Sequence, residues 1–299
     1  MALLIITTIL WAFSFSLIGE YLAGSVDSYF SVLMRVGLAA LVFLPFLRTR
    51  GQSPRTIVLY MLVGAMQLGI MYLLAFRAYL YLTVSEFLLF TVFTPLYITL
   101  IYDLLSGRKL RWGYLLSAAL AVLGAAIIRY DKVSDHFWTG LLLVQLSNLC
   151  FAIGMVGYKR LMEVRPMPQH NAFAWFYVGA FIVAVVAWFM LGNAQKLPTT
   201  TLQWSVLVWL GVVASGLGYF MWNYGATQVD AGTLGIMNNV HVPAGLLVNL
   251  AIWQEQPHWP SFISGALVIL ASLWVHRRWV APHSGQTADD RRRGSAQSE

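Results

Sequence analysis

The chain contains 299 residues, of which 59% are hydrophobic and only 10% are charged, and this composition excludes an ordinary soluble globular protein. The formal net charge of +7 would suit a nucleic-acid-binding protein, but the positive residues lie in short loops between apolar segments. We therefore expect a lipid bilayer, and no nucleic acid, as a partner of this chain. The single cysteine, Cys150, excludes an internal disulfide.

A helix needs about 20 apolar residues to cross a bilayer core, because its backbone groups cannot remain unpaired in lipid. The sequence contains ten such segments, so we predict an all-α membrane protein with ten transmembrane helices. In chain order, these are 2–20, 29–47, 57–76, 80–102, 112–129, 137–158, 171–191, 203–222, 230–252 and 260–276. The polar segment 280–299 is predicted to be a disordered cytoplasmic tail.

The distribution of basic residues predicts the orientation of these helices. Most of the 19 Lys and Arg residues fall in segments on one side of the predicted bundle. The other side holds Arg77, Arg129, Lys132 and Lys196, while Arg35 lies inside the second helix. Because cytoplasmic loops carry an excess of Lys and Arg, both termini are predicted to lie in the cytoplasm.

The second half of the chain resembles the first. Residues 83–102 match residues 231–250, with Pro95 and Pro243 at the same place in each. Because each half has an odd number of helices, the halves must have opposite orientations in the membrane. We predict two inverted five-helix repeats, 1–131 and 132–279. Such repeats are typical of secondary transporters, whose substrate site lies near the membrane midplane.

Several residues mark where the repeats open and close: Trp11-Ala-Phe-Ser-Phe and Phe151-Ala-Ile-Gly-Met, then Pro243, Gln254-Glu255 and Gly265. Together they resemble the EamA-type repeat of the drug/metabolite transporter superfamily. This resemblance implies ten helices in two inverted halves. The first repeat departs from the pattern, because Gly107 stands at the position of Glu255.

The whole chain is also similar to the enterobacterial biotin uptake carriers of this superfamily, especially over residues 84–103 and 227–239 and in the polar tail. That resemblance implies uptake of biotin by alternating access across the bacterial inner membrane, without a cofactor. The alternative is export of amino acids or other small metabolites, which other members perform. The residues by themselves indicate only a carrier of small solutes.

An enzyme is not expected. The sequence has neither an HExxH nor a GxSxG motif, and no predicted metal-binding set is apparent. The titratable residues Glu86 and His241 are predicted at different depths, so they do not form a catalytic pair.

Two ionisable residues, Arg35 and Glu86, are predicted at similar depth in the outer parts of the second and fourth helices. Charges inside a membrane are costly, and they are usually paired or functional. One hypothesis is that Arg35 binds a substrate carboxylate while Glu86 carries a coupling proton. The alternative is a structural ion pair between the two helices.

His241 lies near the middle of the ninth predicted helix, two residues before Pro243. Proline kinks a helix and leaves backbone carbonyl groups unpaired. The imidazole is therefore a candidate for binding substrate and exchanging a coupling proton, or for satisfying those carbonyls. Asn238 lies on the same helix face, three residues earlier.

Other polar and aromatic candidates lie at comparable depth, namely Ser14, Gln67 and Asn148. Amides both donate and accept hydrogen bonds, which suits a neutral cyclic urea as well as a carboxylate. Each amide alone also fits a hydrogen bond that joins two membrane helices. Trp11 and Tyr72 are candidates to cover an apolar ring system. We interpret the set as a substrate-binding site.

Overall fold

The computed structural model describes residues 2–105, 135–229 and 247–254, together with isolated positions between 116 and 127 and between 234 and 275. The described residues form helices and connecting turns and contain no β-strand. The α-helices are α1 (Ala2–Tyr21), α2 (Ser28–Phe43), α3 (Pro54–Gly64), α4 (Met71–Ala78), α5 (Val84–Thr91), α6 (Thr94–Leu105), α8 (Asp135–Val164), α9 (Gln169–Leu191), α10 (Thr201–Trp209) and α11 (Gly218–Thr227). Short 3-10 helices are η1 (Leu44–Phe46) and η4 (Ala194–Lys196), and π-helical segments are η2 (Ala65–Ile70), η5 (Leu210–Leu217) and η6 (Asn249–Trp253).

Among the described residues, seven helical segments are long and apolar enough to cross a membrane. They are Ala2–Tyr21, Ser28–Phe46, Pro54–Ala78, Val84–Tyr102, His136–Val164, Gln169–Leu191 and Thr201–Thr227. They agree with the first four predicted helices and with the sixth to the eighth, so the all-helical membrane class is confirmed. Much of the predicted helices 112–129, 230–252 and 260–276, and all of the tail 280–299, lies outside the described residues.

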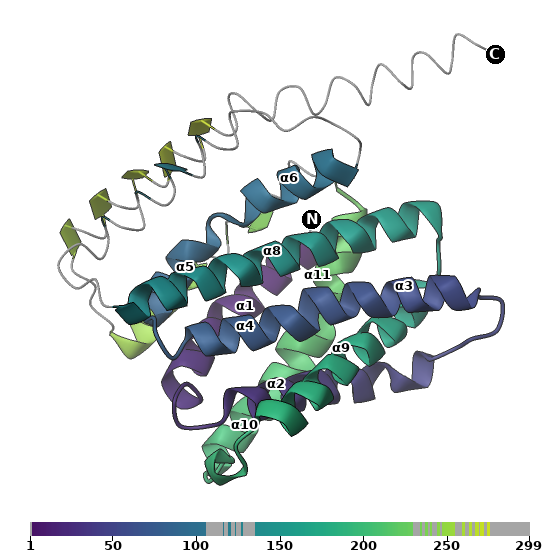
Figure 1. The fold of residues 1–299 in the computed structure, drawn as a ribbon, viewed down its shortest axis with the longest axis horizontal. Coiled ribbons are helices and arrows are strands. Elements are labelled where there is room, and N and C mark those ends of the chain that lie inside the picture. The colour runs from purple at the N-terminus through teal and green to yellow at the C-terminus, as the bar shows by residue number, and fades with distance from the viewer. Residues whose placement is uncertain are drawn as a thin grey trace.

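The helices lie side by side in a bundle (Figure 1), in which α8 packs against α4 and α6, and α9 packs against α2 and α3. Two glycines allow α3 and α9 to approach closely. A Cβ atom on Gly64 would overlap the backbone carbonyl of Phe176, and one on Gly179 would overlap that of Met61. This reciprocal contact brings the two backbones together, as small residues do between membrane helices.

Two spans begin with the same capping motif. The backbone N–H of Thr83 donates to Glu86 Oε2 at 2.9 Å, and the Glu86 N–H donates to Thr83 Oγ1 at 3.3 Å. Thr200 and Gln203 form the equivalent pair at the start of α10. Each motif satisfies donors that the first turn of a helix leaves unpaired, and so determines where the span starts.

The third and eighth spans each contain a π-helical segment, η2 and η5 respectively. The wider turn of η5 leaves backbone carbonyls without their usual helical partners. Tyr177 donates its hydroxyl to the carbonyls of Ser215 and Gly216 at 2.6 and 2.9 Å, and Trp11 Nε1 donates to that of Ala214 at 3.0 Å. The segment is therefore stabilised by α9 and α1.

The fourth span is interrupted before Pro95, where α5 ends at Thr91 and α6 begins at Thr94. Proline has no N–H to donate to the carbonyl four residues earlier. That carbonyl, on Thr91, accepts the hydroxyl of Thr94 at 2.7 Å. The neighbouring carbonyl of Phe90 accepts Asn148 Nδ2 of α8 at 3.0 Å. At this break, the hydrogen bond from Asn148 to the Phe90 carbonyl joins α8 to α5.

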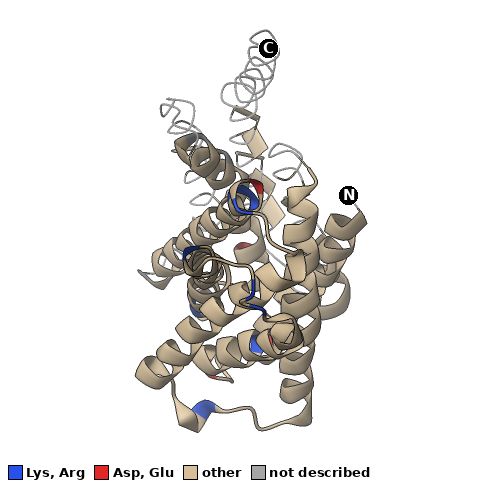
Figure 2. Ribbon diagram, turned by 90° about the vertical axis from the view of Figure 1, so that its right-hand side faces the viewer, with Lys and Arg blue, Asp and Glu red and all other residues tan. Residues whose placement is uncertain are grey.

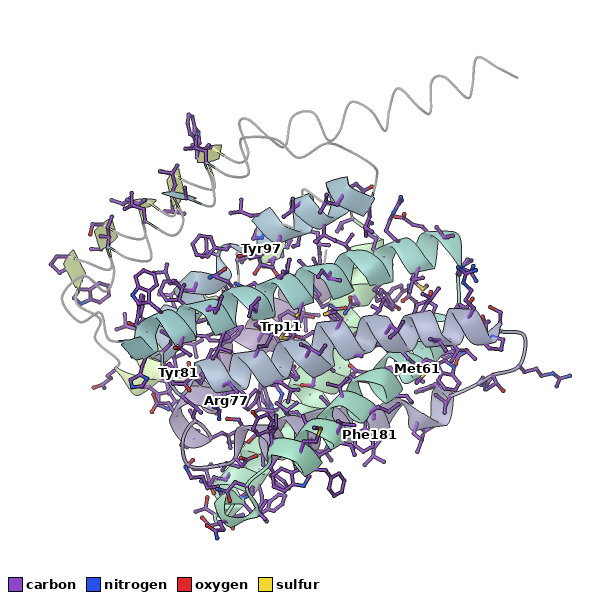
Figure 3. The ribbon with its side chains drawn as sticks, viewed as in Figure 1. Trp11, Met61, Arg77, Tyr81, Tyr97 and Phe181 are labelled. Carbon is purple, nitrogen blue, oxygen red and sulfur yellow. The ribbon has the colours of Figure 1, made fainter. Side chains whose placement is uncertain are left out.

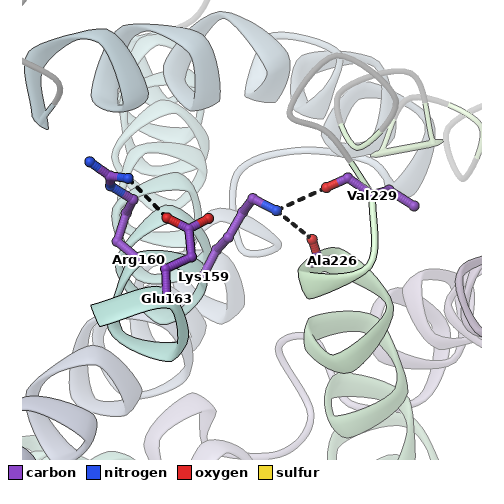
Figure 4. A network of polar contacts seen from close by, with 5 residues as sticks. All are labelled: Lys159, Arg160, Glu163, Ala226 and Val229. Carbon is purple, nitrogen blue, oxygen red and sulfur yellow. Dashed lines mark hydrogen bonds and ion pairs between the residues drawn. The ribbon is translucent and has the colours of Figure 1, made fainter. Parts of the chain in front are cut away.

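Charged residues are sparse along the described helices (Figure 2). Near the end of α8, Lys159 Nζ donates to the carbonyls of Ala226 and Val229 at 3.2 and 2.9 Å, where α11 ends (Figure 4). A cation is favourable at a helix C-terminus, because the last carbonyls carry partial negative charge. Beside it, Arg160 and Glu163 form an exposed ion pair at 2.9 Å.

Candidate functional site

A cavity lies between the helices, and the space inside it that no atom occupies, part of which is open to solvent, is about 650 Å³. Its lining comes from α1, α2, α4, α5, α6, α8, α11 and residue 238, and consists of Trp11, Ser14, Phe15, Ile18, Arg35, Met71, Tyr72, Ala75, Phe76, Tyr79, Phe87, Thr91, Thr94, Ser147, Asn148, Phe151, Tyr219 and Asn238. Figure 3 shows Trp11 inside the bundle and Phe181 at its periphery.

Arg35 is the charged residue of this lining, and its side chain is only 3% exposed. Its Nε donates to Ser215 Oγ at 2.9 Å, and its Nη2 donates to the Tyr72 hydroxyl at 2.8 Å. The guanidinium carbon lies 4.2 Å from the centre of the Tyr72 ring and 5.6 Å from that of Phe76. These neutral contacts orient the cation, and no described residue bonds the other N–H donors of its fork.

No carboxylate lies within ion-pair distance of Arg35 in the part of the chain that the structure describes. The alternative interpretation of Arg35 and Glu86 as a structural ion pair is therefore wrong. Glu86 lies at the first turn of α5, where its Oε2 accepts the N–H of Thr83, and it is absent from the cavity lining. The cap holds the Glu86 carboxylate at the first turn of α5. Glu86 and Arg35 therefore do not meet, although they were predicted at similar depth in the membrane.

Aromatic rings form the walls of the cavity. The ring of Trp11 lies 6.3 Å from Phe151 and 4.7 Å from Tyr219, measured between centroids. Tyr219 in turn lies 5.7 Å from Tyr72. Such a surface suits an apolar ring system held by tilted and edge-on contacts.

Two amides complete the lining. Asn148 donates to the Phe90 carbonyl, and Asn238 is only 1% exposed, with an Nδ2 that has no hydrogen-bond partner among the described residues. The cavity therefore combines one buried cation, an aromatic surface and amide groups. This combination suits an organic anion that also carries an apolar, hydrogen-bonding body.

The family model described as the EamA-like transporter family matches residues 1–130 and 138–277. The chain belongs to the EamA-like transporter family. The match covers most of the chain, and it identifies a transporter rather than an enzyme.

Two relatives of this EamA-like transporter are also similar over most or all of their length. A protein of Escherichia coli (strain K12) named "Biotin transporter" is 83% identical over 299 residues, which is 100% of both chains. A protein of Pseudomonas aeruginosa (strain PAO1) named "Probable biotin transporter" is 55% identical over 279 residues, covering 93% of this chain and 97% of its own.

A solved crystal structure shares the fold of this EamA-like transporter. It superposes with a TM-score of 0.65 and covers 92% of this chain and 95% of its own. The two sequences are 17% identical, so the likeness concerns the fold alone.

The cavity of this transporter brings together most of the candidates predicted from the sequence: Trp11, Ser14, Arg35, Tyr72, Asn148 and Asn238. Gln67 is an exception. It is fully buried in η2, outside the cavity lining, and its Nε2 donates to Asn223 Oδ1 at 3.1 Å. Gln67 thus joins the third and eighth spans, which was the alternative interpretation of each amide. His241 lies outside the described residues.

Several polar residues near the site were not predicted from the sequence, among them Ser147, Ser215 and Tyr219. Tyr219 follows the π-helical segment η5 by two residues, as Tyr72 follows η2. Aligning the third predicted span with the eighth would therefore have found it. Ser215 became visible only through its contact with Arg35, because serines are common in membrane helices as packing residues.

The described residues contain no group of three or more His, Cys, Asp or Glu side chains that could hold a metal ion. The chemistry of the cavity comes instead from the guanidinium, hydroxyl and amide groups described above. These groups can bind and orient a solute.

Proposed function

We propose that this EamA-like transporter carries biotin into the cell as a secondary carrier that works by alternating access. The proposal rests first on the observation that Arg35 is a buried cation in the cavity wall, with no carboxylate partner in the described part of the chain. A desolvated charge of this kind is stabilised when an anionic ligand binds beside it. The full-length relatives named as biotin transporters support biotin as that anion.

The chemistry of biotin matches the cavity in three parts. Its valerate carboxylate is a bidentate acceptor for the unused donors of Arg35. Its fused rings are largely apolar and fit the surface formed by Trp11, Phe151 and Tyr219. Its ureido group carries N–H donors and a carbonyl acceptor, which suit amide side chains such as Asn148 and Asn238.

Two inverted five-helix repeats, over residues 1–131 and 132–279, would provide the moving parts, with ten membrane helices in total. Matched features of the two halves support this arrangement. The third and eighth spans each have a π-helical segment, followed two residues later by the cavity residues Tyr72 and Tyr219. The family model likewise matches the chain in two stretches.

Basic residues support an orientation in the inner membrane with both termini in the cytoplasm. Three basic residues lie at one end of the bundle. The Arg48 N–H donates to Asn171 near the start of α9, and Arg165 Nη1 donates to Thr56 near the start of α3. Lys159 donates to carbonyls at the end of α11. Lys196 is at the other end. The end richer in cations corresponds to the cytoplasmic side.

A closed layer between the cavity and the basic end supports alternating access. Gln67 and Asn223 are hydrogen-bonded and fully buried there, and Trp222 Nε1 donates to Met155 Sδ at 3.3 Å. In the third span the cavity residues come after Gln67, on the side away from the basic end. The bound solute would therefore reach the cytoplasm only after the third and eighth spans separate at this layer.

Uptake of labelled biotin tests the proposal. In cells that lack their own biotin carriers, we expect accumulation only when this transporter is produced, because the solute needs the cavity to cross the bilayer. Unlabelled biotin in excess should prevent the accumulation. Equal uptake with and without the protein would refute the substrate, and faster loss from preloaded cells would favour an exporter instead.

Proton coupling is proposed for Glu86 and His241. In liposomes with an imposed pH gradient, we expect Glu86→Gln or His241→Ala to abolish the dependence of uptake on the gradient. Glutamine keeps an oxygen that can accept the Thr83 N–H, so Glu86→Gln preserves the cap while it removes the titration. Gradient-driven uptake that persists in both variants would contradict this coupling.

A further inference from the structure

Asn238 is a buried amide with unused hydrogen-bonding capacity. Its side chain is 1% exposed and lines the cavity, and its Nδ2 has no partner in the part of the chain that the structure describes. Buried polar groups in proteins are nearly always hydrogen-bonded, so an exception that faces a cavity points to a ligand. An amide can supply one donor group and one acceptor to that ligand.

Asn148 offers an acceptor whose orientation is determined. Its Nδ2 donates to the backbone carbonyl of Phe90 at 3.0 Å. Because a carbonyl oxygen only accepts, the amide nitrogen must face Phe90, and Oδ1 points away from it. Within the described residues this Oδ1 has no hydrogen-bond donor, and Asn148 lines the cavity.

A series of aromatic contacts connects the helix that carries Asn148 to Arg35. On α8, Phe151 follows Asn148 by one helical turn, and its ring contacts Trp11. Trp11 contacts Tyr219, and Tyr219 contacts Tyr72, whose ring lies beneath the guanidinium. Asn148, Asn238 and Arg35 line the same cavity, so one elongated ligand could contact the cation at one end and the amides at the other.

We infer that Asn148 and Asn238 form the subsite for a cyclic urea, and that they determine which ring system the carrier accepts. One ureido N–H donates to Asn148 Oδ1, and the ureido oxygen accepts from Asn238 Nδ2. This inference rests on the proposed function, because it assigns the ureido end of biotin to the two amide side chains and its carboxylate end to Arg35. It adds Asn238 as the residue that distinguishes a ureido oxygen from other groups.

Competition between biotin analogues tests the subsite. Desthiobiotin keeps both the carboxylate and the ureido group, so it should compete nearly as well as biotin. 2-Iminobiotin replaces the ureido oxygen with a nitrogen that is protonated at neutral pH. This group is a donor and would meet the Asn238 donor, so we expect it to compete at least about tenfold more weakly than biotin with the wild-type protein.

Substitutions at Asn238 should change this preference. Asn238→Asp replaces the donor with an acceptor, and it should raise the affinity for 2-iminobiotin relative to biotin by at least about tenfold. Asn238→Ala removes the donor, and it should reduce the wild-type discrimination between the two compounds toward unity. Asn171→Asp is the matched control, because Asn171 is a buried amide that bonds the Arg48 N–H outside the cavity.

The ratio of the two affinities separates recognition from folding, since a structural defect weakens both compounds together. An unchanged ratio in folded Asn238→Asp and Asn238→Ala proteins would overturn the subsite and leave biotin transport standing. Failure of the wild-type protein to bind biotin or desthiobiotin would overturn the proposed function and, with it, the subsite.

Discussion

Replacing Arg35 by alanine is expected to weaken biotin binding by about 100-fold or more, equivalent to about 2.8 kcal/mol. The guanidinium is buried, lies in the cavity wall and is held by Ser215 and Tyr72, while no described carboxylate neutralises it. Its removal would leave the substrate carboxylate desolvated and without a cation. Titration of purified protein with labelled biotin measures the effect, and uptake in carrier-deficient cells should fall in parallel.

Replacing Arg35 by lysine tests whether biotin binding needs the planar guanidinium or only its positive charge. Arg35→Lys keeps the charge but loses the planar fork that can bond both Tyr72 and a carboxylate, so we expect an intermediate loss of about tenfold. Arg160→Ala is the control, because Arg160 forms an exposed ion pair with Glu163 away from the cavity. Full affinity in Arg35→Lys would argue against bidentate binding, and full affinity in Arg35→Ala would exclude the proposed carboxylate site.

Substituting Gly64 or Gly179 by valine is expected to destabilise the fold by about 3 kcal/mol or more. At both positions a new Cβ would overlap a backbone carbonyl of the facing helix, and a backbone cannot move aside without separating α3 from α9. Thermal unfolding of the detergent-solubilised protein should show a lower Tm, with less monodisperse protein on size exclusion.

Gly157→Ala is the matched control for these glycines. Its Cβ would lie 3.3 Å from Val63 Cγ2, a side-chain atom that can shift by a few tenths of an ångström. We expect a Tm close to that of the wild-type protein. Equal stability of Gly64→Val and Gly157→Ala would mean that α3 and α9 do not meet as closely as described.

The membrane helices were largely predictable, because hydropathy over about 20 residues is a local property of the sequence. The span at residues 54–78 was predicted as 57–76, and the difference arises from Ser53, which caps the helix just before Pro54. The longer α8 continues to Val164, beyond the predicted end at 158.

The partners of the polar residues were less predictable. Arg35 is buried in the cavity wall, and its contact with Ser215 joins residues 180 positions apart. Asn148 bonds Phe90 at the break before Pro95, and Gln67 bonds Asn223 instead of facing the cavity. Depth along a helix can be estimated from a sequence, whereas rotation about the helix axis depends on all neighbouring helices.

The sequence by itself determined the class of this protein, the positions of the described membrane spans and the type of solute expected, because these depend on hydropathy, on local motifs and on family resemblance. The tertiary structure decided which polar residues meet. It placed Arg35 with Ser215 and Tyr72 in a cavity and assigned Glu86 to a helix cap. It also placed Asn238 in the cavity lining with a donor that no described residue uses. These outcomes depend on helix rotation, helix breaks and π-helical segments, which arise when the helices pack against one another.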